Sequence, residues 1–104
     1  MKVKRGWATD FGKIRFDVEV DETDLLRMLT AHGCTTPEET AATMDTYVVF
    51  RILDAEAQAY VAATLARQEP GTAETHRAQA GAWRTQRDKL LTEVLHPKDP
   101  AAGG

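Results

Sequence analysis

Apolar and charged residues alternate strictly over residues 13–20, and the apolar positions are Ile14, Phe16, Val18 and Val20. Because successive side chains of a strand point to opposite faces of a sheet, this pattern predicts a β-strand with one apolar face. The turn-forming sequence Asp10-Phe11-Gly12 precedes it, so residues 3–9 are a candidate hairpin partner, although their own alternation is poor. We therefore expect a short N-terminal strand or β-hairpin.

A first helix is predicted over residues 22–32. Asp21 stands at the N-cap position before a run of leucines, and acidic residues in the first turn complement the helix dipole. Gly33 follows where a left-handed C-cap residue is needed. The sequence Thr36-Pro37-Glu38-Glu39 then supplies an N-cap, a proline at the first helical position and a capping-box glutamate, which predicts a second helix from Pro37.

This second helix is predicted to span residues 37–68. Apolar residues recur in it at spacings of three and four, at Ala41, Met44, Val48, Ile52, Ala55, Ala59, Ala62 and Ala66. The segment 47–53 is rich enough in β-branched and aromatic residues to form a buried strand instead. Because the helical spacing continues through it and no glycine or proline interrupts residues 38–69, one long helix with a kink near Asp45 is the favoured interpretation.

A third helix is predicted over residues 73–95, where apolar positions again recur at helical spacing until Pro97 ends the pattern. The short turn at Pro70-Gly71 makes it the antiparallel neighbour of the second helix. Residues 98–104 are expected to form a disordered tail. The predicted fold is mostly α with a short N-terminal β-strand or hairpin (α+β) and three helices, of which the last two form an antiparallel helical hairpin.

Composition narrows the class of protein. The 104 residues suffice for one small domain, expected to span residues 1–97, because two hydrophobic cores would each be marginal. No apolar run approaches the roughly 20 residues that cross a bilayer, and no apolar stretch resembling a secretory signal follows the N-terminal charges. Together with the single cysteine, Cys34, these features predict a cytoplasmic protein. The absence of Ser and Asn is typical of GC-rich coding and indicates a bacterial or phage source.

Residues that carry catalysis or bind metals are sparse. His32 and Cys34 are separated by one residue and could form a zinc site with His76 or His96, but the second short-spaced pair of ligands that structural zinc sites need is missing. The carboxylates between residues 17 and 24 occupy the solvent face of the strand and the first helical turn, which is typical of a solvated acidic face. A nucleophilic serine and a glycine-rich phosphate loop are absent from the sequence. We expect no catalytic residues, no metal and no cofactor.

Two groups of cations are candidate contacts for acidic partners. The N-terminus places Lys2, Lys4 and Arg5 beside Trp7, a mixture that grips phosphate and stacks on bases, although a solvated leading strand is the simpler interpretation. In the third helix, Trp83 is surrounded by basic residues that we interpret as an exposed flank, namely Arg77, Arg84, Arg87 and Lys89. The formal net charge of −3 argues against non-specific binding of nucleic acid.

Residues 14–53 resemble the ribbon-helix-helix fold of small bacterial repressors and antitoxins. The resemblance rests on the alternating strand, on Asp21-Glu22 opening a helix with Leu25 and Leu26, on Gly33 and on the Thr36-x-x-Glu39 cap. In that family the strand pairs with its copy in a dimer and its outward side chains enter the major groove. The corresponding positions here are Lys13, Arg15, Asp17 and Glu19. Two of the four are carboxylates, and this departure bears on DNA binding more than on the fold.

The second helix carries more apolar surface than one neighbouring helix covers, since Tyr47, Phe50 and Tyr60 lie outside its main stripe. With Trp83, they are of the aromatic types enriched at interface hot spots, and a place in the hydrophobic core is the equal alternative for each of the four. We therefore expect a non-enzymatic interaction or oligomerisation protein, an adaptor or regulator that forms a homodimer or docks onto a larger protein through its hairpin. The alternative is a ribbon-helix-helix DNA-binding repressor or antitoxin dimer, whose candidate contacts are Lys2, Lys4, Arg5, Trp7, Lys13 and Arg15.

Overall fold

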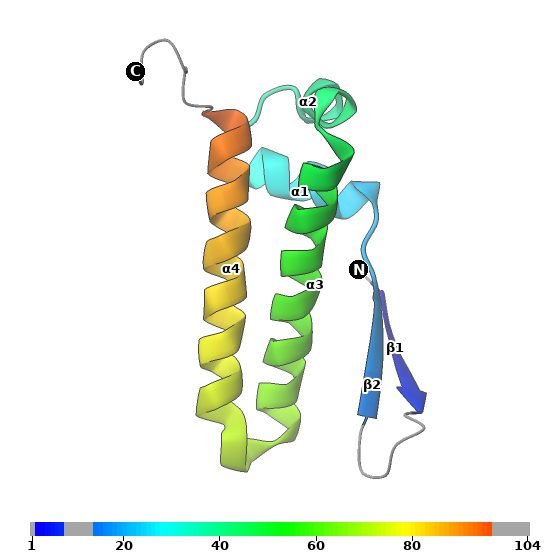
Figure 1. Ribbon diagram of the computed structural model, residues 1–104, viewed down its shortest axis with the longest axis vertical. Coiled ribbons are helices and arrows are strands. Elements are labelled where there is room, and N and C mark those ends of the chain that lie inside the picture. The colour runs from blue at the N-terminus through cyan, green and yellow to red at the C-terminus, as the bar shows by residue number, and fades with distance from the viewer. Residues whose placement is uncertain (1, 8–13, 97–104) are drawn as a thin grey trace.

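The computed structural model describes residues 2–7 and 14–96, with the side chains of residue 2 and of residues 18–96. Within these residues the chain forms a β-hairpin, four α-helices and one 3₁₀ helix. In chain order they are β1 (Lys2–Trp7), β2 (Ile14–Glu19), α1 (Glu22–Ala31), α2 (Pro37–Thr43), α3 (Thr46–Gln68), η1 (Pro70–Thr72) and α4 (Ala73–Leu95). The expected class, mostly helical with an N-terminal β-hairpin and an antiparallel pair of long helices, is confirmed (Figure 1).

The β-hairpin is antiparallel, and its register pairs Lys2 with Glu19 and Trp7 with Ile14. The candidate partner strand is thereby confirmed over Lys2–Trp7. The predicted turn at residues 10–12 and the tail at 98–104 lie outside the described residues. In Figure 1 the hairpin lies along α3, and α4 lies on the other side of α3 in this view. The β-hairpin therefore adds a second layer beside one helix of the long pair.

Both ends of α1 are closed by the predicted residues. The Asp21 side chain accepts a hydrogen bond from the Asp24 backbone N–H at 3.1 Å, and the Asp24 carboxylate accepts one from the Asp21 N–H at 3.1 Å. This reciprocal pair is a capping box. At the other end Gly33 has φ of +87°, and the N–H groups of Gly33 and Cys34 donate to the carbonyls of Thr30 and Leu29 at 3.0 Å. This is the Schellman arrangement, which requires a left-handed residue.

The single helix predicted over residues 37–68 is wrong, because the chain breaks it into α2 and α3 at Met44 and Asp45. Met44 is extended, with ψ of 143°, and Asp45 caps α3 by accepting a hydrogen bond from the Tyr47 N–H at 2.8 Å. An aspartate cap satisfies an amide at the start of a new helix without any glycine or proline. The predicted capping box at Thr36 is also wrong, since that side chain makes no cap hydrogen bond.

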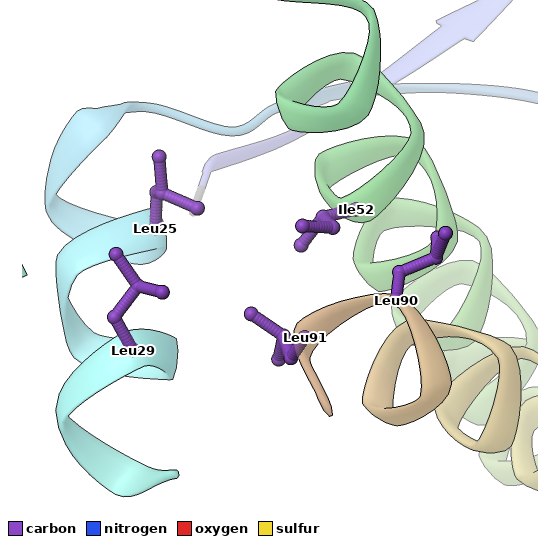
Figure 2. Close-up of a cluster of buried hydrophobic side chains, with 5 residues drawn as sticks. All are labelled: Leu25, Leu29, Ile52, Leu90 and Leu91. Atoms are coloured by element: carbon purple, nitrogen blue, oxygen red, sulfur yellow. The ribbon is translucent and has the colours of Figure 1, made fainter. Parts of the chain in front are cut away.

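The hydrophobic core lies at one end of the long helical pair (Figure 2). Its fully enclosed members come from three helices, namely Leu25 and Leu29 of α1, Ile52 of α3, and Leu90 and Leu91 of α4. Ala41 and Met44, at the end of α2, pack against this cluster. The break at Asp45 therefore lets α2 turn across the end of α3 and close the core. Residues 47–53 are helical and do not form a strand, and the helical spacing brings Ile52 of this segment into the core.

The other half of the α3–α4 pair is held by small residues. The buried positions there are alanines: Ala59, Ala62 and Ala66 on α3, with Ala73 and Ala80 on α4. Small side chains let two helix backbones approach closely, since the distance between helix axes follows the size of the residues at the contact. The 3₁₀ turn η1 joins the helices directly, so the predicted antiparallel hairpin is confirmed. Away from the leucine core, α3 and α4 therefore pack closely through small side chains, and their remaining side chains form two outer surfaces of the helical hairpin.

Candidate interaction surface

The four aromatic residues expected at an interface are the large apolar side chains that remain exposed in the described part of the chain. Their exposed fractions are 67% for Tyr47, 64% for Phe50, 38% for Tyr60 and 37% for Trp83. Their neighbours on α3 behave differently, because Val48, Val49 and Leu53 pack against the core. Helix α1 and the core thus cover one part of the surplus apolar surface of α3 and leave Tyr47 and Phe50 uncovered.

Tyr47 and Trp83 border one continuous surface on α3 and α4, and Phe50 lies one helical turn before a residue of that surface, Asp54. Tyr47 and Phe50 lie in the first turns of α3, and the Arg51 guanidinium lies 5.9 Å from the centre of the Tyr47 ring. Arg51 and Asp54 also line a groove of about 360 Å³ between the helices, where Trp83 of α4 forms part of the opposite wall. We call the set of Tyr47, Phe50, Arg51, Asp54 and Trp83 the aromatic face.

Tyr60 does not belong to the aromatic face. It follows Arg51 by nine residues, which is two and a half helical turns, so the two side chains leave α3 in opposite directions. It does not line the groove beside Trp83. The sequence predicted one candidate interface for all four aromatics, whereas the structure separates Tyr60 from Tyr47 and Trp83.

The basic flank expected around Trp83 is divided by the structure. Arg77 and Arg84 are exposed, but with Arg67 of α3 they line a second groove of about 660 Å³. This groove and the Trp83 groove lie on opposite sides of the contact between α3 and α4. Around the axis of α4, Ala80 of that contact lies between Arg77 and Arg84 on one side and Trp83 on the other. The interpretation of Arg87 as an exposed flank residue is wrong, because it turns inward toward α3.

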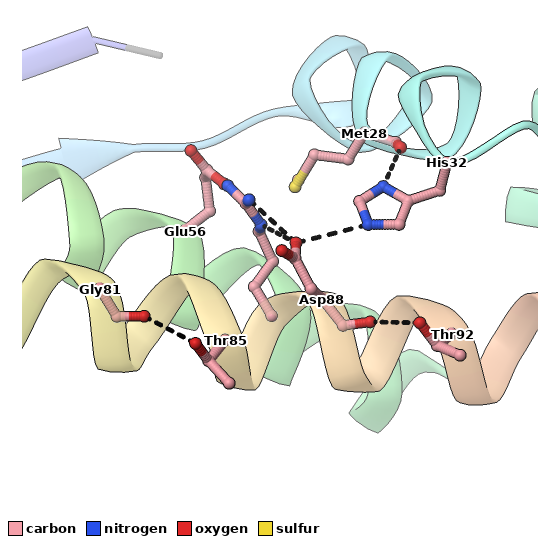
Figure 3. Close-up of polar contacts among 8 residues, drawn as sticks. Met28, His32, Glu56, Gly81, Thr85, Asp88 and Thr92 are labelled. Atoms are coloured by element: carbon pink, nitrogen blue, oxygen red, sulfur yellow. Dashed lines mark hydrogen bonds and ion pairs between the residues drawn. The ribbon is translucent and has the colours of Figure 1, made fainter.

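Arg87 is the centre of a polar junction between three helices (Figure 3). Its guanidinium pairs with Glu56 of α3, and with the neighbouring Asp88 at 2.9 Å. Asp88 in turn lies 3.4 Å from Nε2 of His32, whose Nδ1 donates to the Met28 carbonyl at 3.1 Å. Burial lowers the pKa of Arg87, but the hydrogen bonds and charges of Glu56 and Asp88 outweigh it and raise the pKa. Arg87 therefore stays charged and fixes α3 to α4.

Asp24 is the buried charged residue among the described side chains. Burial raises the pKa of its carboxyl, whereas the hydrogen bond from the Asp21 N–H lowers it, and the net pKa lies below the ordinary value. Arg27 lies 3.7 Å from the same carboxylate. Because Asp24 closes the capping box of α1, its charge supports the helix and is not part of the exposed surface.

Three of the four candidate zinc ligands make other side-chain contacts. Cys34 lies 3.3 Å from the hydroxyl of Thr40, and His76 pairs with Glu69 at 3.0 Å. His32 belongs to the junction with Asp88. Within residues 2–7 and 14–96, no three or more His, Cys, Asp or Glu side chains are grouped so that they could hold a metal ion.

The candidate nucleic-acid contacts fall mostly where side chains are not described. Lys2 is exposed, Lys13 lies outside the described residues, and so do the side chains of Lys4, Arg5, Trp7 and Arg15. The strand register places Lys2 opposite Glu19 and Lys4 opposite Asp17, so each of these two basic positions faces an acidic position across the pair of strands. Pairing with β1 also takes one edge of β2, which leaves its other edge for the intermolecular pairing typical of ribbon-helix-helix proteins. DNA binding through this segment stays a prediction.

Comparison with known proteins adds no relative. No family model matches the sequence, and neither a curated protein nor a solved structure matches it. None of the helices in the described part of the chain is long and apolar enough to cross a membrane.

Sequence reasoning missed Arg51, Asp54 and Arg67 as members of these surfaces. A signal for Arg67 was present, because it lies just before the Pro70 turn and an antiparallel helical hairpin brings it level with the first turns of α4. Arg51 could have been found from its spacing of four residues after Tyr47, which places both on one side of a helix. Asp54 carries no such signal, because its place beside Trp83 depends on how the two helices pack.

Proposed function

We propose that this chain is a non-enzymatic interaction protein that acts through the aromatic face of its helical hairpin. The observation that carries the proposal is the exposure of Tyr47 and Phe50 near the Trp83 groove, because at 67% and 64% they are the most exposed large apolar side chains among residues 18–96. Exposed aromatics that cluster near a groove are typical of residues that dominate binding at protein interfaces. A second copy of the chain is the first partner to test, in a homodimer, and a larger protein is the other.

The charges of the aromatic face support a protein partner. Arg51 and Asp54 line the same groove, and the described residues provide neither with an ion-pair partner. Charges that are unpaired in the free chain are available to fix the orientation of a partner. A cytoplasmic setting is part of this proposal, because Cys34 is a free thiol and a reducing compartment suits it.

Light scattering coupled to size-exclusion chromatography, over a range of micromolar concentrations, tests the self-association. We expect a mass above that of one chain, and we expect Phe50→Ser to return the protein to one chain. Because Phe50 is exposed, this change should leave the free energy of unfolding within about 0.5 kcal/mol. Tyr60→Ser is the matched control, since it removes an exposed aromatic that lies outside the aromatic face.

A wild-type protein that stays monomeric at every concentration contradicts self-association. The larger partner is then tested in the native host with a photo-crosslinking phenylalanine analogue in place of Phe50. We expect one specific protein adduct there, and none when the same analogue replaces Tyr60. Equal adducts at both positions, or none, would mean that the aromatic face is not the contact surface.

A further inference from the structure

The second groove, on the other side of the helical hairpin, has its own chemistry. It occupies about 660 Å³, within the range of ligand pockets, and lies toward the turn that joins α3 to α4. Its lining combines three arginines, Arg67, Arg77 and Arg84, with a floor of alanines that includes Ala66, Ala73 and Ala80. None of the residues that line it is acidic. We call it the arginine groove.

The three arginines lack carboxylate partners among the described residues. Arg27 and Arg87 each lie within 4.0 Å of a carboxylate oxygen, whereas no such ion pair is found for Arg67, Arg77 or Arg84. Arg67 makes one long hydrogen bond, of 3.5 Å, to the Thr64 hydroxyl. A chain with a net charge of −3 thus keeps three unneutralised cations around one groove. Such a concentration of one sign of charge attracts a ligand of the other sign.

The spacing of the cations suits an extended ligand. Arg77 and Arg84 are seven residues apart on α4, which places their Cα atoms about 10 Å apart along the helix axis. Arg67 lies on α3, at the other wall of the groove. Cations therefore lie on both sides of a shallow channel about two helical turns long. The floor between them is apolar, and its accessible part comes from Ala63 and Pro70 together with the edges of the buried alanines, so a small apolar stripe can pack on it.

We propose that the arginine groove binds an acidic amphipathic helix of a partner protein. Small apolar residues of that helix would pack on the alanine floor, and Asp or Glu side chains along its edges would pair with the arginines. This is the helix-in-groove mode of recognition, with bidentate arginine–carboxylate pairs supplying the orientation. A phosphate ligand would use the cations but not the apolar floor. The proposal does not rest on the aromatic face, which lies on the other side of the contact line between α3 and α4.

The test is a titration of the full ¹⁵N-labelled chain, followed by amide chemical shifts, with a capped helical peptide of Ala and Glu. We expect shift changes at Ala66, Ala73 and Ala80 and none at the Trp83 indole. A peptide with Gln in place of every Glu should bind at least about tenfold more weakly, because it cannot form charged pairs with the arginines. Raising the salt concentration should weaken the binding in parallel.

Variants assign the binding to the arginines. The double variant Arg77→Gln/Arg84→Gln should weaken the Glu peptide at least about tenfold. Both residues are exposed, so a spectrum that retains its dispersion shows that the fold is kept. Lys89→Gln is the matched control, because Lys89 is an exposed cation on α4 that lines neither groove, and it should bind like the wild type.

Three further results would overturn the proposal. The first is no shift at millimolar Glu peptide, or equal binding of the Glu and Gln peptides. The second is a double variant that binds like the wild type. The third comes from parallel titrations with inorganic phosphate and with a short DNA duplex. Equal or tighter binding of either one at the same amides would assign the groove to phosphate and not to an acidic helix.

Discussion

Arg87 of α4 and Glu56 of α3 form an ion pair across the helical hairpin, at the level where α1 packs against it. Both side chains are about four-fifths buried, so each would be left in a poorly hydrated site without the other. Asp88 and His32 extend the contact to the end of α1. The pair lies between the alanine-lined half of the helical hairpin and the leucine core, and it fixes the register of α3 against α4.

Removing the Arg87 side chain should therefore destabilise the fold. We expect Arg87→Ala to lower the free energy of unfolding by about 1.5–3 kcal/mol, which is the range for hydrogen bonds to charged groups. Urea denaturation of the variant and the wild type measures this difference. Lys89→Ala, two residues further along, should change it by less than about 0.5 kcal/mol because Lys89 is exposed. Additive effects of Glu56→Ala and Arg87→Ala in a double-mutant cycle would show that the pair is not coupled.

The Asp24 carboxylate predicts a stability that depends on pH. Its pKa in the folded chain lies below the unfolded value, so its ionised form stabilises the fold. That contribution is complete above the unfolded value, about pH 4, and is lost as the pH falls through the lower folded pKa. Asp24→Asn keeps an oxygen that can accept the Asp21 hydrogen bond and removes the charge, so it should cost about 0.3–1 kcal/mol at pH 7, the usual size of a carboxylate near a helix N-terminus. The difference from wild type in urea denaturation should shrink below about pH 4, and a difference that grows there would contradict the assignment.

Two glycines predict opposite responses to the same substitution. Gly33 has φ of +87°, so Gly33→Ala forces an alanine into the left-handed region at a cost of about 1–2 kcal/mol. Gly81 lies inside α4, and a Cβ added there meets no atom within 4 Å. Gly81→Ala should stabilise the chain by about 0.5–1 kcal/mol, since alanine loses less backbone freedom in a helix. The midpoint temperature of thermal unfolding should therefore fall for Gly33→Ala and rise for Gly81→Ala. Shifts of the same sign would contradict the requirement for a left-handed residue at Gly33.

The alanine contact between α3 and α4 should not tolerate a larger residue. Ala80 is buried between the helices, so Ala80→Leu should force them apart and destabilise the fold by about 1–3 kcal/mol. Ala78→Leu places the same side chain on the exposed surface of α4 and should change the free energy of unfolding by less than about 0.5 kcal/mol. Equal effects of the two variants in urea denaturation would mean that the helices do not approach closely there.

Features carried by a few neighbouring residues were predictable. The Asp21 cap, the left-handed Gly33 and the turn at Pro70 each depend on hydrogen bonds or backbone preferences within about five residues. The periodic spacing of Ile52 and the alanines likewise predicted a helix, because a pattern every three or four residues reflects one buried side. Phe50 and Leu53 both lie off that side, yet Leu53 packs against the core and Phe50 is exposed, so the spacing alone did not decide which of them is covered.

The packing of distant segments set the remaining features. Asp45 is compatible with a continuous helix or with a new cap, and the contacts of Met44 with the core favour the cap. Arg84 and Arg87 are alike in sequence, yet one lines a groove and the other pairs with Glu56, 31 residues earlier. Side chains so far apart meet only when α3 and α4 adopt one register, and local propensity carries no information about that register. For this reason the sequence alone determined the helices and most of their caps, whereas the packing of α3 against α4 decided which side chains form the two surfaces of the helical hairpin.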